Sequence, residues 1–114
     1  MNKDAAVQAR VDMLAKIFSG RLHVRYQKIN ETFALCQAEP GMEAHWIELH
    51  RLLESLSAAA FSFGFDALGA EATLVELRVK DMLGQQSRHR HDVTEVGAAV
   101  QALQGGGDAP VSTL

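Results

Sequence analysis

Apolar residues recur three and four positions apart along most of this chain, and this spacing restricts the possible folds more than any other feature. It places the apolar side chains on one side of an α-helix, whereas a half-buried β-strand needs them at every second position. The spacing predicts helices over residues 4–38, 42–63, 65–84 and 93–103. The side chains expected to be buried are Leu14, Phe18, Leu22, Tyr26, Ile29, Phe33 and Cys36 in the first segment, Trp46, Leu49, Leu53, Leu56, Ala60 and Phe63 in the second, Leu68, Ala72, Val75, Val79 and Met82 in the third, and Val93, Val96, Val100 and Leu103 in the fourth.

Glycine, proline and aspartate residues mark the ends of these segments. The first segment is one long helix or two helices in line, with a bend at Ser19–Gly20, because glycine loosens the hydrogen-bond ladder of a helix. Pro40 then stops it, since proline disfavours helix for the residue before it. Gly64 is expected to cap the second helix, and Asp66 is a candidate N-cap of the third.

Length and composition favour one helical domain. The chain has 114 residues, of which 47% are hydrophobic and only 6% aromatic, a balance that favours helices packed on one another over a sheet. Helices joined by short turns lie antiparallel, so we expect an all-α fold, an up-down helical bundle, over residues 1–104. Residues 105–114 offer nothing to bury, and we expect them to form a disordered C-terminal tail.

Charge and composition also argue against several functions. The formal net charge is −3 and no basic stripe is present, so we expect no nucleic-acid partner. No apolar run is long enough to span a bilayer, and the N-terminus lacks the apolar run of a signal peptide, so we expect a soluble, cytoplasmic protein without a membrane partner. Cys36 has the spacing of a small buried hydrophobe, and the pair His89 and His91 lacks the pattern of a metal site. We expect no metal, no cofactor and no independent enzyme active site.

The most specific part of the sequence is residues 49–72. It opens with the turn Leu-His-Arg-Leu at residues 49–52, and its helix is expected to end at Phe63–Gly64. The segment resembles the signature helix of the histidine-containing phosphotransfer (HPt) family. In that family the signature reads roughly His-x-Leu-Lys-Gly-Ser-Ala, and a Leu-His-Arg-Leu turn often precedes it.

Counting along this signature places a glutamate where the family carries its phosphorylated histidine. Leu56 matches the leucine, Ser57 replaces the lysine and Ala58 replaces the glycine, which sets Glu54 at the histidine position. Histidine-based transfer needs an imidazole nitrogen, which a carboxylate lacks. The resemblance therefore implies a degenerate member of the family, folded as an antiparallel four-helix bundle with an N-terminal helical extension.

The signature helix also predicts a docking surface. At about 100° per residue, Glu54 points away from the expected core, in the company of apolar residues. In the family this surface receives the receiver domain of a response regulator, so the resemblance implies a non-catalytic signalling protein that binds a receiver or a histidine kinase. The expected partner-binding residues are Ile47, Ala58 and Phe61 on the side of Glu54, with His50 and Ser57 toward its flank, and Glu54 itself.

Two alternatives remain open from the sequence. In the first, the protein carries phosphate on a non-standard histidine, His50, which lies one helical turn before Glu54. A simpler interpretation of His50 is a surface residue paired with Glu54 at the i, i+4 spacing. In the second alternative, the bundle is a scaffold or a homodimer with no connection to phosphorelays.

Overall fold

The computed structural model describes residues 2–85 and 88–106. This part of the chain forms five α-helices and no β-strand, which confirms the predicted all-α class. The helices are α1 (Asn2–Gly20), α2 (Leu22–Ala38), α3 (Glu43–Ser62), α4 (Asp66–Leu83) and α5 (Arg90–Gly106).

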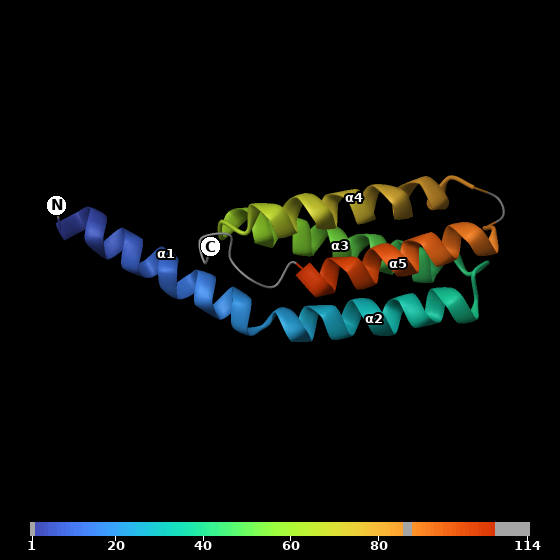
Figure 1. Cartoon of the computed structure of the whole chain (residues 1–114), viewed down its shortest axis with the longest axis horizontal. Helices are drawn as coiled ribbons and strands as arrows, with labels where there is room; N and C mark the ends of the chain where they lie inside the picture. Colours follow the sequence, from blue (N-terminus) through green and yellow to red (C-terminus); the bar gives the residue numbers. More distant parts are fainter. Residues whose placement is uncertain (1, 86–87, 107–114) are drawn as a thin grey trace.

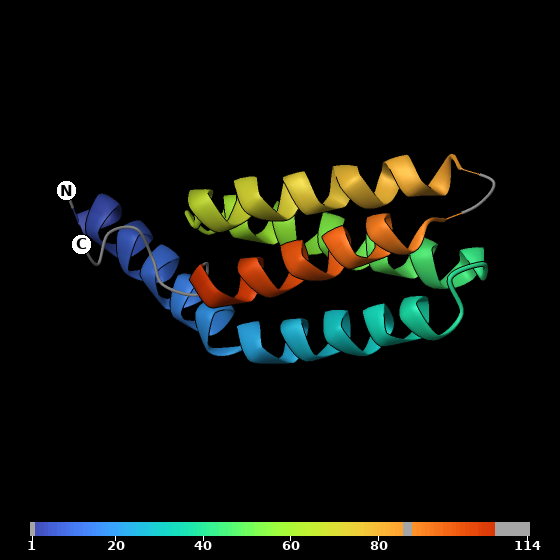
Figure 2. The ribbon, with the colours of Figure 1, turned by 45° about the vertical axis from the view of Figure 1, so that its right-hand side comes forward.

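Helices α2 to α5 lie side by side as a bundle, and α1 extends beyond one end of it (Figures 1 and 2). In Figure 1, α2 and α4 run toward the right-hand end, and α3 and α5 run back toward the left. Helix α3 packs most extensively on α4 and next on α2, and α5 packs on α4 and α2. Each helix of the bundle therefore contacts its neighbour in the chain, and the contact between α2 and α5 closes the set.

The first predicted segment is two helices, as one of its two alternatives allowed. Helix α1 ends at Gly20 and α2 begins at Leu22; the intervening Arg21 donates its backbone N–H to the carbonyl of Phe18 at 3.1 Å. The ring of Phe18 lies 5.5 and 5.0 Å, centroid to centroid, from the rings of Phe63 and Phe65. The last turn of α1 is thus attached to the bundle.

The predicted apolar stripes form the core. All the side chains expected to be buried are buried, or in the case of Phe63 partly buried against the core, with the exception of Leu14. Leu14 is 41% exposed, so its prediction was wrong. Leu14 does lie on the apolar side of α1. At this position, however, α1 extends beyond the end of the bundle, so no other described helix covers the side chain.

Trp46 is the central core residue and joins several elements. Its side chain is fully buried, and its indole Nε1–H donates to the carbonyl of Pro40 at 2.9 Å. The ring of Phe33 on α2 meets it edge-on, with centroids 6.5 Å apart. The guanidinium of Arg88, which also pairs with Glu43, lies 5.9 Å from the centroid of the indole. Trp46 therefore links α2, α3 and the residues that precede α5.

A glycine turn ends α3. Gly64 has a φ of +85°, in the left-handed region that residues with a Cβ atom avoid. The N–H of Phe65 donates to the carbonyl of Ala60 at 2.8 Å, and the N–H of Gly64 donates to that of Phe61 at 3.2 Å. These are the two hydrogen bonds of a Schellman motif, which confirms the predicted glycine cap.

We expect Gly64→Ala to lower the free energy of unfolding by about 1 kcal/mol, because alanine is strained at positive φ. Urea unfolding followed by circular dichroism measures the change. Gly84→Ala is the matched control: Gly84 follows α4 with an ordinary φ of −82°, and an added Cβ atom would make only an ordinary contact there. Equal losses in both variants would contradict the role assigned to the left-handed turn.

The N-cap predicted for the next helix was wrong. Phe65 occupies that position, without a side-chain hydrogen bond to the helix, and Asp66 is the first residue of α4. The reason is that the chain returns to helix directly after the Schellman turn at Gly64 and Phe65, so α4 begins one residue earlier than a capping aspartate at position 66 requires. Asp66 still places a negative charge in the first turn of α4, where it interacts favourably with the positive end of the helix dipole.

Helix α5 is longer than predicted at both ends. It begins at Arg90, three residues before Val93, and runs to Gly106. Residues 105 and 106 therefore belong to the helix and not to the tail, because the buried Leu103 holds the last turns on the bundle and offsets the low helix propensity of glycine. The rest of the predicted tail, residues 107–114, lies outside the described residues.

Cys36 is a buried apolar residue, as expected. Its side chain is fully buried on α2, and this burial raises the pKa of the thiol from 9.0 to about 12, although the nearby positive charge of Arg88 opposes the rise. A thiol with this pKa is neutral at physiological pH and a poor nucleophile.

The buried thiol predicts a loss of stability in alkali. Above about pH 9 the thiol ionises in the unfolded chain and stays protonated in the folded one, so the unfolded state binds fewer protons. The free energy of unfolding should therefore fall as the pH rises, by about 1 kcal/mol between about pH 8 and about pH 10. Urea unfolding at several pH values measures the slope. The Cys36→Ala variant should lack this component; an unchanged slope in that variant would contradict the assignment.

Candidate functional site

Four residues predicted for docking share one exposed face of α3, which we call the α3 face: Ile47, Glu54, Ala58 and Phe61. All four are exposed, and helix geometry places them within a sector of about 60° around the axis. The two large apolar members stand out, since Ile47 is 55% and Phe61 48% exposed. Among the described residues, Glu54 has no ion pair and no side-chain hydrogen bond. The α3 face thus combines an unpaired carboxylate with apolar neighbours.

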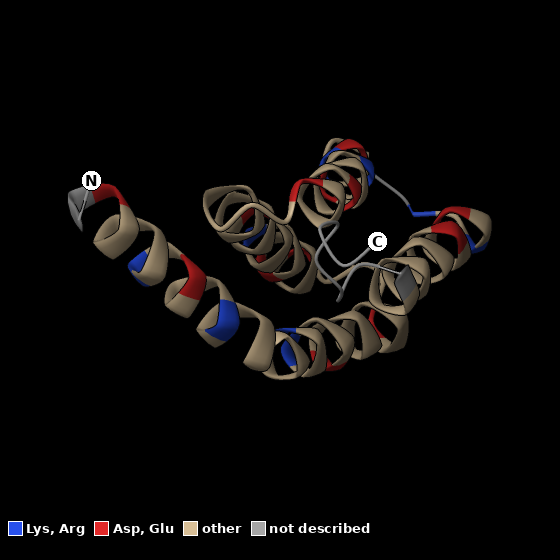
Figure 3. Ribbon diagram, turned by 60° about the vertical axis from the view of Figure 1, so that its left-hand side comes forward, with Lys and Arg blue, Asp and Glu red and all other residues tan. Residues whose placement is uncertain are grey.

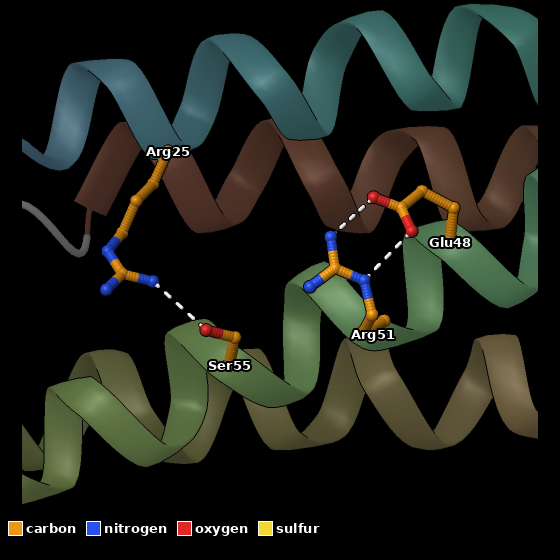
Figure 4. A network of polar contacts seen from close by, with 4 residues as sticks. All are labelled: Arg25, Glu48, Arg51 and Ser55. Atoms are coloured by element: carbon orange, nitrogen blue, oxygen red, sulfur yellow. Dashed lines mark hydrogen bonds and ion pairs between the residues drawn. The ribbon is translucent and has the colours of Figure 1, made fainter.

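The flank of α3 that faces α2 differs, because its polar side chains contact one another (Figure 4). Arg51 donates to both carboxylate oxygens of Glu48, at 2.9 and 2.6 Å, and Arg25 of α2 donates to the hydroxyl of Ser55 at 3.4 Å. The hydrogen bond from Arg51 holds the pKa of Glu48 below its usual value. On this flank the carboxylate of Glu48 is thus paired within the chain, whereas that of Glu54 on the α3 face has no such partner among the described residues.

His50 lies at the other flank, against α4. Its Nε2 atom is 3.0 Å from a carboxylate oxygen of Glu76, an ion-pair distance whose angle does not make a hydrogen bond, and this nitrogen is enclosed. The expected pairing of His50 with Glu54 was therefore wrong. Because His50 lies at the flank of α3, its side chain points toward α4. It therefore lies closer to the carboxylate of Glu76 than to that of Glu54, one turn away on α3.

Ser57 is not a surface residue, and its prediction as part of a docking surface was wrong. It is 7% exposed, and its hydroxyl donates to the carbonyl of Gly69 at 3.1 Å and lies 2.6 Å from the hydroxyl of Thr73. Thr73 also donates to the same carbonyl at 2.9 Å. Ser57 therefore fastens α3 to α4 from below the surface.

The structure adds Gly69 of α4 to the site, which the sequence reasoning had missed. A Cβ atom built on Gly69 would lie 2.8 Å from the ring of Phe61, so the absent side chain is what allows the ring to lie on α4. A glycine inside a helical segment is the sequence signal of such a close approach. The position of Phe61 on the α3 face therefore depends on two helices.

Neither metal chemistry nor a known relative helps to assign this site. Among residues 2–85 and 88–106, no group of three or more His, Cys, Asp or Glu side chains is placed to hold a metal ion.

None of the described helices combines the length and apolar character needed to cross a membrane. Comparison with known proteins finds no family model that matches the chain and no similar sequence among curated proteins.

Proposed function

We propose that this chain is a degenerate HPt-like signalling protein that binds a receiver domain or a histidine kinase through the α3 face and does not carry phosphate. In this proposal, helices α2 to α5 are the antiparallel up-down four-helix bundle of the family, and α1 is its N-terminal extension. The observation that carries the proposal is the exposure of Glu54 among Ile47, Ala58 and Phe61, at the position where the family presents its phosphorylated histidine.

The chemistry of the position supports binding without transfer. A transferable phosphoryl group needs a nucleophilic imidazole nitrogen, and Glu54 offers only carboxylate oxygens. Ser57, at the lysine position of the signature, is buried and bonded to α4, so it supplies no positive charge to the site. The enclosed Nε2 of His50 does not favour that residue as a substitute acceptor. A carboxylate surrounded by apolar side chains can still bind, because apolar burial supplies affinity and the charge sets orientation.

Binding measurements with charge-changing variants test the proposal. Isothermal titration against a panel of receiver and histidine-kinase domains should find a partner, and Phe61→Asp and Glu54→Arg should each weaken that binding by about tenfold or more. The matched controls are Leu74→Asp, on the exposed side of α4, and Glu31→Arg, on the exposed side of α2; both should bind normally. Wild-type affinity in both Phe61→Asp and Glu54→Arg would refute the α3 face as the docking surface.

A transfer assay separates the proposal from a phosphocarrier. After incubation with phosphorylated receivers, the wild-type chain should carry no acid-labile label, whereas Glu54→His should gain one, because an imidazole nitrogen then attacks the phosphorus atom and displaces the receiver's aspartate. Label on the wild-type chain that disappears in His50→Ala would replace our proposal with transfer through His50.

A further inference from the structure

Helix α1 carries an apolar stripe that no described part of the chain covers. Val7 is 59% exposed and Val11 44%, and the stripe continues through the half-exposed Leu14 to the buried Phe18 at spacings of four, three and four. The same spacing in α2 is buried against the bundle. Since α1 extends past the bundle end (Figures 1 and 2), only Phe18 of this stripe, at the base of the helix, packs on the bundle, and the exposed Val7 and Val11 meet no other described helix.

A hollow lies at the base of α1, where this helix joins the bundle. Its volume is about 380 Å³. The lining is apolar apart from two arginines, Arg21 and Arg25, and consists otherwise of Leu14, Ile17, Phe18, Val24 and Phe63. Such a hollow fits an apolar side chain that is followed by a negative charge.

The outer half of α1 has these properties. Asp4 lies one turn before Val7, and neither Asp4 nor Arg21 makes an ion pair within the described residues. The sequence of α1 holds five charged residues whose signs alternate along the chain: Lys3, Asp4, Arg10, Asp12 and Lys16. The red and blue segments of α1 in Figure 3 show this alternation beyond its first residues. No block of like charge would therefore oppose the approach of a second α1.

An antiparallel second copy of α1 matches this stripe in a single register. When Val11 faces Leu14 of the second copy, Val7 lies over the hollow that its buried Phe18 lines, and Asp4 lies toward its Arg21. These residues occupy the a and d positions of a heptad pattern, which are the contact positions of paired helices. The register places the apolar pair of Val11 and Leu14 near the centre, Val7 over the hollow and opposite charges at both ends, and a two-fold axis repeats every contact.

We propose that two copies of this chain associate through α1, antiparallel about a two-fold axis, with the outer half of each α1 over the hollow at the base of the other. The inference is independent of the proposed signalling function. Phe63 lines the hollow, whereas Phe61 belongs to the α3 face, so each copy keeps a docking surface of its own.

Sedimentation equilibrium of the full chain tests the association. The wild-type chain should reach twice its monomer mass at micromolar concentration, and the double variant Val7→Glu/Val11→Glu should raise the dimer dissociation constant by about 100-fold or more, because it places charges in the apolar centre. The double variant Ala5→Glu/Ala9→Glu adds the same charge to the opposite side of α1 and should remain dimeric.

A charge exchange adds a test that misfolding cannot imitate. Asp4→Arg should weaken the dimer, and Asp4→Arg combined with Arg21→Asp should restore it, because the exchanged charges again face each other. A monomeric wild-type chain at high concentration would overturn the proposal, and so would a dimer indifferent to Val7→Glu/Val11→Glu. A monomer whose α1 instead binds a receiver domain or lipid vesicles would overturn it as well and identify the other occupant.

Discussion

Trp46→Ala should lower the free energy of unfolding by about 3–5 kcal/mol, a large part of the stability of a domain of this size. The substitution removes the largest fully buried side chain and leaves a cavity between α2 and α3. It also leaves the carbonyl of Pro40 without the indole donor at 2.9 Å and the guanidinium of Arg88 without the ring beside it. Urea unfolding followed by circular dichroism measures the loss.

The neighbouring residue supplies the control. Ile47 follows Trp46 directly in the chain but is mostly exposed, so Ile47→Ala should change the free energy of unfolding by less than about 1 kcal/mol. Losses of similar size in Trp46→Ala and Ile47→Ala would mean that α3 is rotated about its axis so that Ile47 also faces the core.

Gly97→Leu should cost about 1–3 kcal/mol of unfolding free energy, because it overfills the contact between α5 and α2. A Cβ atom built on Gly97 would lie 2.9 Å from the ring of Phe33. This ring also packs against the buried Trp46. The ring therefore has little room to move aside. Ala98→Leu, at the next and exposed position, introduces the same side chain without a clash and should be nearly neutral.

A double variant tests the cause of this loss. Phe33→Ala opens space beside Gly97, so Gly97→Leu should cost less in that background than in the wild-type chain, a coupling that only directly contacting residues show. Strict additivity of the two losses would indicate that Gly97→Leu acts through some other contact.

The core could be predicted from sequence because burial in a helix follows the three-and-four spacing of apolar residues. Val79 and Val96 illustrate this point, since each lies on a stripe and is buried. Leu14 has the same spacing and is exposed, because periodicity identifies the apolar side of a helix but not whether another helix reaches it. The end of α3 was also predictable, since Gly64 occupies a position that favours glycine.

Part of the candidate site was predictable because the spacing of residues along a helix also shows which side chains point outward. Rotation about the helix axis identifies Glu54 and Phe61 as outward residues without knowledge of any neighbour. The surroundings of the flank residues His50 and Ser57 depend on α4, which contacts them through Glu76 and through the carbonyl of Gly69. Spacing along α3 alone contains no information about them.

The order of the helices in the bundle has a consequence for folding kinetics. Because most contacts join helices adjacent in the chain, their formation needs only short loops to close, and chains of this kind fold in about microseconds to milliseconds. The contact between α2 and α5 is the exception, and there the side chains of Asn30 and Gln104 exchange hydrogen bonds of 3.0 and 2.6 Å. We expect this contact between the first and last helices of the bundle to form after the rate-limiting step of folding. Substitutions at Asn30 or Gln104 should therefore accelerate unfolding and leave the folding rate nearly unchanged.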